Sequence, residues 1–405
     1  MLQNSLNDVV VLDLSRHLSG PYATRILSDM GARVIRVEQE DARHRALENA
    51  SPPPGFVNVN ADKESICVRL KSKEGLEVIH DLVARSDVVV ENFRPGATKA
   101  MGLDYEALMA RRPEIIYCSI NGFGSNGPWA RKPAFDAITQ AMSGAMFATG
   151  ESDRSPALMT VNIGDLAASC CAASAILAAL HARQRGLGGT HIDMSMMDAL
   201  LFLMPFHTQI FLQTGYVMGR HGSGYGPRSI AGCFATSDQK FVQVLCPYPK
   251  FQRSLMRVIA GVPGFETIEA DTRFAGDLDR LQNNEAFLEQ ARQAFLRRTQ
   301  NEWLKILAEA EVPHGPIMTV AEALESEQAN ARGLVTTIDA PEFGNTYKTL
   351  ASPFHTADVS TSTKGPRKVS PFAADTHGVL NAFLGYSDAK IAELVSLGAI
   401  IPPSN

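Results

Sequence analysis

The stretch DVVVLDLSRHLSGPYATRILSDMGARVIRVE, residues 8–38, decides the fold class of this chain. Its first part, Asp8–Leu14, is a short apolar run rich in β-branched residues, which is typical of a buried parallel strand. The pattern of Tyr22–Gly31 predicts a helix, and Ala32–Glu38 predicts a second strand. A strand, a helix and a strand in this order predict a βαβ unit and an α/β domain.

The alternation of strands and helices continues beyond this unit. ESICVRL at 64–70, DVVVENF at 87–93 and IIYCSINGF at 115–123 are typical of strands, and KEGLEVIHDLVARS at 73–86 predicts a helix. The first strand–helix turn carries Ser19-Gly20-Pro21 in place of GxGxxG, so a dinucleotide-binding fingerprint is not supported.

Bulk composition narrows the class of protein. A chain of 405 residues exceeds the size at which one core stops growing, so two domains are expected. The net charge of -5 offers no basic stripe for a nucleic acid. No metal site or disulfide framework is indicated, and the six cysteines are expected to be buried in a reducing compartment. With no signal peptide, and with an apolar run at Ala199–Phe206 too short to span a bilayer, a cytoplasmic protein without a membrane partner is expected.

The second half of the chain carries weaker signals. Residues 186–212 are expected to form a turn, a strand and one long apolar helix. The segment GRHGSGYGPRS at 219–229 is either a domain linker or part of a site, and composition leaves both readings open. Pro341–Pro371 is expected to be an extended connection with little regular structure, and a Ser387 cap is expected to open the last helix.

One carboxylate stands at the start of a helix made of small residues, in VNIGDLAASCCAASAILAAL at 161–180. Asp165 precedes an apolar run, which predicts an N-cap residue. A positioned, ionised carboxylate beside small side chains is also suited to act as a nucleophile. The residues alone favour the cap and leave the nucleophile open.

Several segments together resemble the family III CoA-transferases, which include formyl-CoA transferase and carnitine CoA-transferases and are related to α-methylacyl-CoA racemase. The resemblance spans almost the whole chain and is weakest at about 204–311. The matching segments are GPYATRILSDMGARVIRVE at 20–38, VENFRPGATKAMGLDYEAL at 90–108, GFGSNGPWARKPAFDAITQAMSG at 122–144, IGDLAAS at 163–169, HIDMSMMDAL at 191–200, VPHGPIMTVAEAL at 312–324 and LGYSDAKIAEL at 384–394.

The resemblance implies an enzyme that moves CoA from an acyl-CoA thioester to a carboxylic acid acceptor, with Asp165 as the nucleophile. It implies an acyl-aspartyl anhydride and then an aspartyl-CoA thioester as intermediates. It implies no metal and no cofactor beyond CoA itself.

The resemblance also implies a CoA site, which departs from the family pattern at Gln39 and Ala100, where formyl-CoA transferase has arginines, and at Leu18, where it has a glutamine. These departures put the phosphate contacts and an oxalate-type substrate in doubt. The candidate CoA-binding residues are Arg16, His17, Leu18, Lys71, Asn92, Phe93, Arg94, Lys99 and Met101. The candidate active-site loop, which would close over Asp165, contains Gly222, Gly224 and Gly226.

Two other functions are weighed against the transferase. Racemases of this relationship carry a histidine base where this chain has Phe135, and phenylalanine cannot transfer a proton, so an α-methylacyl-CoA racemase-like isomerase is disfavoured. A non-catalytic acyl-CoA-binding subunit of a hetero-oligomer is disfavoured because Asp165 is present.

The expected architecture is α/β, with a large Rossmann-like domain built from N- and C-terminal parts and a smaller α/β domain. Residues 1–205 would form the first part of the large domain, 206–228 a linker with the glycine-rich segment, 229–318 the small domain, and 319–405 the return linker and the rest of the large domain. The resemblance implies an interlocked homodimer, and a heteromer is not excluded.

Overall fold

The structure is a computed structural model that describes residues 2–39, 55–225, 229–340, 345–354 and 367–403. The chain forms two compact units. The larger unit comprises Met1–Ala145, Met159–Gln213 and Glu327–Asn405, and the smaller comprises Met146–Leu158 and Thr214–Ser326. Each unit is therefore assembled from segments that are far apart in the chain.

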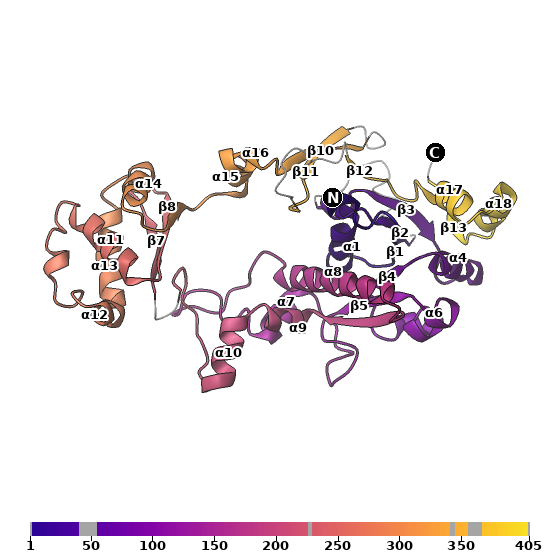
Figure 1. Cartoon of the computed structure of the whole chain (residues 1–405), viewed down its shortest axis with the longest axis horizontal. Coiled ribbons are helices and arrows are strands. Elements are labelled where there is room, and N and C mark those ends of the chain that lie inside the picture. The colour runs from indigo at the N-terminus through magenta and orange to yellow at the C-terminus, as the bar shows by residue number, and fades with distance from the viewer. Residues whose placement is uncertain (1, 40–54, 226–228, 341–344, 355–366, 404–405) are drawn as a thin grey trace. The chain divides into compact units, whose positions relative to one another are not determined.

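The larger unit is built on a seven-stranded sheet with the order β13-β3-β2-β1-β4-β5-β6 (Figure 1). Six strands are parallel, and β13 pairs antiparallel with β3 at one edge. The α/β class predicted from residues 8–38 is confirmed. The strands are β1 (Val10–Asp13), β2 (Arg33–Glu38), β3 (Lys63–Val68), β4 (Val88–Glu91), β5 (Ile116–Asn121), β6 (Thr190–Ser195) and β13 (Ile400–Ile401).

Helices cover both faces of this sheet, and the strands supply apolar side chains to each. Because successive strand residues point to opposite faces, Val11 joins one apolar cluster and Leu12 the other. The Val11 cluster includes residues of α1 (Ser19–Asp29), α8 (Ile163–Gln184) and α9 (Met196–Phe202). The Leu12 cluster includes residues of α4 (Lys73–Ala84), α6 (Tyr105–Arg111), the π-helical turn η5 (Val379–Phe383) and α18 (Asp388–Ser396). Burial on both faces explains why the strands are apolar runs without alternation.

Helix α8 is, by length and composition alone, apolar enough to cross a membrane. Half of its most apolar window is buried inside the protein, where Ala168, Ala172 and Ile176 face the sheet cluster. Small side chains along α8 let it lie close to α1, so its apolar character is that of a core helix.

Three predictions about local structure are wrong. The one long helix expected at the end of residues 186–212 is broken at Leu203 and Met204 into α9 and α10 (Pro205–Thr214), because Pro205 lacks the N–H that would continue α9. The connection at 341–371 contains part of a sheet in which β10 (Val335–Ala340) pairs antiparallel with β11 (Asn345–Leu350) and parallel with β12 (Arg367–Lys368). All six cysteines are free, but Cys170 is exposed on α8.

The Ser387 cap is confirmed, since the Ser387 side chain accepts a hydrogen bond from the Lys390 N–H. Short elements complete the described part of the larger unit. They are η1 (Leu2–Asn4), α3 (Phe56–Asn60), α5 (Ala97–Ala100), α7 (Asp136–Ser143), α16 (Glu327–Ala331) and α17 (Thr376–Gly378).

The smaller unit packs helices on a three-stranded antiparallel sheet, β7-β8-β9. Its core is aromatic: Phe295 stacks between Phe234 and Trp303, with ring centroids 4.5 and 4.1 Å away. Trp303 donates its indole N–H to the Phe295 carbonyl (2.8 Å), which satisfies the polar atom of a fully buried ring. The elements are β7 (Ile230–Ala235), β8 (Phe241–Cys246), α11 (Pro249–Ala260), η2 (Ile268–Ala270), α12 (Asp277–Gln282), α13 (Asn284–Phe295), α14 (Gln300–Glu309), β9 (His314–Pro316) and α15 (Val320–Glu325).

Candidate active site

The large sheet has a topological switch point between β1 and β4. The chain adds β2 and β3 on one side of β1, then β4, β5 and β6 on the other. The connections that leave β1 and β4 therefore diverge. In open α/β sheets, ligands bind in the crevice outside the carboxyl ends of the strands at such a point. Residues 14–18 and 92–96, which follow β1 and β4, therefore frame the candidate site.

A buried polar cluster fixes the end of β1. The Asp13 carboxylate accepts hydrogen bonds from the Ser15 N–H (3.0 Å), the Thr24 hydroxyl (2.6 Å) and Lys63 Nζ (3.0 Å). The side chains of Asp13 and Lys63 are both fully buried. Burial lowers the pKa of Lys63 to about 8 against the opposing effect of Asp13. Removing either partner would leave an unpaired buried charge, so this pair anchors the turn that follows.

The turn between β1 and α1 has an unusual backbone. His17 has φ +64°, a left-handed conformation that is uncommon outside glycine. A Cβ atom on Gly20 would lie 2.2 Å from Ser15 Cβ, so this close approach requires glycine. From the other strand, Asn92 Oδ1 accepts the Arg16 N–H (2.8 Å) and Asn92 Nδ2 donates to the Arg16 carbonyl (2.6 Å). The turn is thus held from both sides of the switch point.

Helix α8 begins at Ile163, so Asp165 is its third residue and not its N-cap. The prediction of a cap at Asp165 is therefore wrong. Asp136, at the start of α7, does that work: its Oδ1 accepts the N–H groups of Gly164 (2.7 Å) and Asp165 (3.3 Å). Because the cap is supplied by another helix, the Asp165 side chain is not needed to satisfy the first turn of α8.

Asp136 is itself held in place by its neighbours. Gln140 Nε2 donates to Asp136 Oδ2 (2.6 Å) and to the Met159 carbonyl (3.1 Å), and Gln140 Oε1 accepts the Met159 N–H (3.1 Å). A Cβ atom on Gly164 would lie 2.7 Å from Thr139 Oγ1, so glycine allows α8 to begin directly against α7. This arrangement fixes the position of Asp165 relative to α7.

The Asp165 carboxylate lies half-buried between α7, α8 and the turn before α1. Burial raises the pKa of Asp165, and the nearby Asp136 carboxylate raises it further. Hydrogen bonds from the Ser19 side chain and backbone, and the proximity of His17, act in the opposite direction. The result is a carboxylate that is poorly solvated and more basic than an exposed one.

The structure brings together some of the candidate CoA-binding residues and not others. Arg16, His17 and Leu18 follow β1, and Asn92 and Phe93 follow β4, directly across the switch point. The Arg16 guanidinium lies over the Phe93 ring, 5.7 Å from its centroid. The remaining candidates are placed as follows: Arg94 and Lys99 are exposed on the same connection, Met101 is half-buried against the Leu12 cluster, and Lys71 is exposed after β3 with no contact that links it to the others. Gln39 follows β2, and Ala100 ends α5.

Sequence reasoning missed three residues of this site. Ser19 contacts Asp165, Asp136 caps α8, and Glu91 closes β4 with a side chain that accepts the Phe93 N–H (2.8 Å). Burial raises the pKa of Glu91 to about 7. Sequence signals could have found two of the three: Ser19 directly precedes Gly20-Pro21, and Glu91 ends an apolar strand.

The glycine-rich segment lies in the smaller unit and Asp165 in the larger, so its role as a lid stays a prediction. Gly222 has φ +55° and donates its N–H to the Gly150 carbonyl (2.9 Å). A Cβ atom on Gly222 would lie 2.3 Å from Glu151 Oε2. Gly224 donates to the His221 carbonyl (2.8 Å). Gly226 lies outside the described residues.

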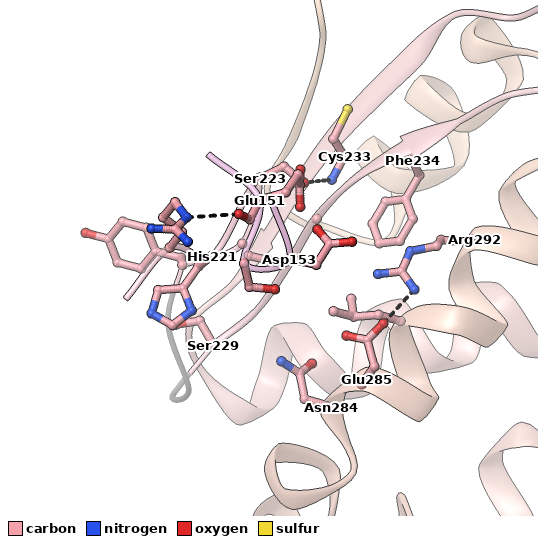
Figure 2. A pocket seen from close by; sticks show the side chains of 17 residues that line it. Glu151, Asp153, His221, Ser223, Ser229, Cys233, Phe234, Asn284, Glu285 and Arg292 are labelled. Carbon is pink, nitrogen blue, oxygen red and sulfur yellow. Dashed lines mark hydrogen bonds and ion pairs between the residues drawn. The ribbon is translucent and has the colours of Figure 1, made fainter. Parts of the chain in front are cut away.

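A cavity of about 580 Å³ lies in the smaller unit beside this segment (Figure 2). Its lining has the carboxylates of Glu151, Asp153 and Glu285 and the guanidiniums of Arg220 and Arg292. Figure 2 shows Arg292 and Glu285 facing each other from α13, with their charged groups 2.8 Å apart. The Arg220 guanidinium donates to the carbonyls of residues 151 (3.0 Å) and 147 (3.3 Å). With carboxylates in excess, this cavity by itself does not favour an anionic substrate.

Over the described ranges, no cluster of three or more histidine, cysteine, aspartate or glutamate side chains is arranged to hold a metal ion.

Comparison with known proteins finds similar sequences over most of the chain. A family model described as "CoA-transferase family III" matches residues 6–371. The chain is 36% identical to the acetyl-CoA:oxalate CoA-transferase of Acetobacter aceti over 81% of this chain and 84% of that protein. It is 31% identical to the succinyl-CoA:glutarate CoA-transferase of Mus musculus over 98% of this chain and 90% of that one.

A solved structure gives the same result for the fold. The crystal structure of a CAIB/BAIF family protein from Brucella suis superposes with a TM-score of 0.79 at 30% sequence identity, covering 93% of this chain and 98% of that one.

Proposed function

Because this chain belongs to CoA-transferase family III, we propose that it moves CoA from an acyl-CoA thioester to a carboxylic acid acceptor through covalent intermediates on Asp165. Its relatives are CoA-transferases that act on acyl-CoA and carboxylic acids, and they favour neither a racemase-like isomerase nor a non-catalytic subunit. The observation that carries the proposal is the Asp165 carboxylate, freed from capping α8 by Asp136 and held by Ser19 at the switch point.

Each step of the proposed reaction breaks one carbon–sulfur or carbon–oxygen bond as it forms another. An Asp165 oxygen attacks the thioester carbonyl carbon, the carbon–sulfur bond breaks, and CoA thiolate leaves an acyl-aspartyl anhydride. The thiolate then attacks the Asp165 carbonyl carbon, which gives an aspartyl-CoA thioester and releases the donor acid. The acceptor carboxylate repeats the sequence in reverse, taking the CoA and restoring Asp165. Covalent catalysis of this kind replaces one difficult step by several easier ones.

The surroundings of Asp165 suit the first step. A carboxylate that burial and Asp136 make more basic is a stronger nucleophile than one in water. The Ser169 hydroxyl, 2.7 Å from the carbonyl oxygens of both Ser19 and Asp165, holds the start of α8 beside the N-terminus of α1. All steps are acyl transfers between oxygen and sulfur, so we propose that no cofactor or metal is needed beyond CoA.

We propose that CoA lies along the carboxyl edge of β1 and β4, where Arg16, Arg94 and Lys99 offer cations to its phosphates. The Phe93 ring beside Arg16 offers a surface for the adenine. The names of the relatives support a short dicarboxylic acid as the acceptor, since one acts with oxalate and another with glutarate.

We also propose that the protein is a cytoplasmic homodimer. Helices α9 and α10 support a protein partner, because α10 has no buried residue and the large apolar side chains Phe202, Phe206 and Leu212 are 76%, 67% and 75% exposed. An apolar surface of this kind is typical of a permanent interface.

The decisive experiment traps the intermediate. Wild-type enzyme incubated with acyl-CoA and then hydroxylamine should carry a hydroxamate on the peptide that contains Asp165, as read by mass spectrometry. Asp165→Asn should abolish both the label and transfer, whereas Asp388→Asn, at an exposed carboxylate of α18, should change neither. A label on another carboxylate, or normal transfer by folded Asp165→Asn enzyme, would overturn the proposal.

A further inference from the structure

The Asn92 side chain is occupied by the protein itself. Its Nδ2 donates to the Arg16 carbonyl (2.6 Å) and lies 3.4 Å from Ser19 Oγ, and its Oδ1 accepts the Arg16 N–H (2.8 Å). An asparagine amide has two donor hydrogens, and both are engaged here. Asn92 therefore has little left with which to bind a substrate, although the family resemblance places it among the CoA contacts.

These hydrogen bonds hold a backbone that would otherwise relax. Arg16 lies directly before His17, whose left-handed φ of +64° is unfavourable for a residue with a side chain. Leu18, the N-cap of α1, has no side-chain hydrogen bond that would fix the helix start. Pairing of both backbone groups of Arg16 with one amide on another strand supplies the missing constraint.

The constrained turn leads directly to the nucleophile. Ser169 joins Ser19, the first residue of α1, to Asp165, because its hydroxyl lies 2.7 Å from the carbonyl oxygen of each. Ser19 and His17 both lower the pKa of the Asp165 carboxyl, against burial and Asp136. A shift of this turn would move both groups relative to α8, which is fixed independently by Asp136.

We propose that Asn92 is a positioning residue whose amide clasps Arg16 and so sets Ser19 and His17 against the Asp165 carboxylate. This inference rests on the proposed function of Asp165. It differs from a CoA contact, which would act on substrate affinity, and from a purely structural role, which would act on stability.

The clasp has a signature in the pH dependence of the reaction. The groups that face Asp165 are Asp136 from α7, and Ser19 and His17 from the turn and α1. Loss of the clasp withdraws Ser19 and His17 and leaves Asp136 in place. The pKa of Asp165 then rises, and the acidic limb of the rate profile moves to higher pH.

The test compares Asn92→Ala, Asn92→Asp and Arg94→Ala. Asn92→Asp is isosteric but presents an acceptor to the Arg16 carbonyl and Ser19, where the amide presents donors. Both Asn92 variants should lower kcat by at least about tenfold, change the KM for acyl-CoA by less than about threefold, and move the acidic limb upward. Arg94→Ala, a substitution of an exposed candidate phosphate contact, should raise KM and leave the acidic limb where it is.

Three results would overturn the inference. Asn92 variants that behave like Arg94→Ala would make Asn92 a ligand contact. Reduced thermal stability with unchanged kcat and acidic limb would make it purely structural. Ser19→Ala provides a measurement that does not require the Asn92 variants to fold: because Asn92 acts through Ser19, it too must move the acidic limb upward, and an unmoved limb refutes the inference. Failure of the Asp165 label in wild-type enzyme would instead refute the proposed function.

Discussion

Replacement of Glu91 by glutamine should stabilise the protein near neutral pH. Glu91 ends β4 with a side chain that is only 5% exposed. Burial raises its pKa from 4.5 to about 7, Asp193 adds to the rise, and hydrogen bonds from Phe93 and Ser119 oppose it. One pKa unit corresponds to about 1.4 kcal/mol, so the charged form is about 3 kcal/mol less favourable in the folded protein than in the unfolded chain.

The sign of the effect follows from proton binding. Between pH 4.5 and about 7 the unfolded chain has lost the Glu91 proton while the folded protein keeps it. The folded state binds more protons, so the free energy of unfolding falls as the pH rises through this window. The glutamine amide can accept the Phe93 N–H through Oε1, as the carboxylate does, without a charge. Glu91→Gln should therefore match wild type near pH 4.5 and exceed it by up to about 3 kcal/mol above pH 7.

Hydrogen exchange, read by mass spectrometry on peptides that cover β4 and β5, measures the local stability of both proteins at each pH. It does not assume that both units unfold together. Glu393→Gln, at an exposed position of α18, is the matched control and should keep the pH dependence of wild type. A Glu91→Gln protein that loses protection equally at every pH would refute the reasoning. It would show that the hydrogen bonds of the carboxylate stabilise the fold more than burial of its charge destabilises it.

Three further outcomes are expected. Deuterium exchange at the α-carbon of a 2-methylacyl-CoA in heavy water should be absent or very slow by NMR, because Phe135 stands where a proton-transferring base would be needed; rapid uptake would contradict this. Gly222→Ala places a side chain at φ +55° and against Glu151, which should lower the free energy of unfolding by about 1–2 kcal/mol. If the glycine-rich segment is a lid, the substitution should also raise acyl-CoA hydrolysis relative to transfer. An unchanged ratio of hydrolysis to transfer in a stable protein would leave the segment as a linker. Lys63→Met should destabilise the larger unit by about 3–5 kcal/mol in urea unfolding by leaving Asp13 buried without its partner, and a loss below about 1 kcal/mol would show that the pair is not needed.

The βαβ unit at residues 8–38 was predictable because a doubly covered parallel strand must be apolar on both sides, and a run such as Val9–Leu12 records this directly. The sheet between Val335 and Lys368 was not, because one of the partners of β10 is the two-residue β12. Such short pairings are decided by tertiary packing, here against α3, and leave little local pattern.

The candidate site also has a part that the sequence predicts and a part that it does not. Asp165 could be singled out because small residues surround it and a family motif contains it. Its relation to Asp136 and Ser19 could not, since those contacts join segments that are 29 and 146 residues away along the chain, and only the sheet order brings them together. The cap of α8 is an example. Local sequence predicts Asp165 as the cap, whereas in the fold Asp136 of another helix accepts the first N–H groups of α8.

The segment that closes the large sheet is synthesised long after the strands that it covers. β3 gains its outer partner only when β13 pairs with it, and the Leu12 cluster is covered only when η5 and α18 arrive. Asp375 and Thr376 hold β3 from 310 and 309 residues away. During synthesis at about 5–20 residues per second, an apolar sheet face and an unpaired strand edge stay exposed on the ribosome for on the order of ten seconds or more after β6 has emerged. Nascent chains of this protein should therefore be clients of ribosome-associated chaperones until residues 372–403 have been translated.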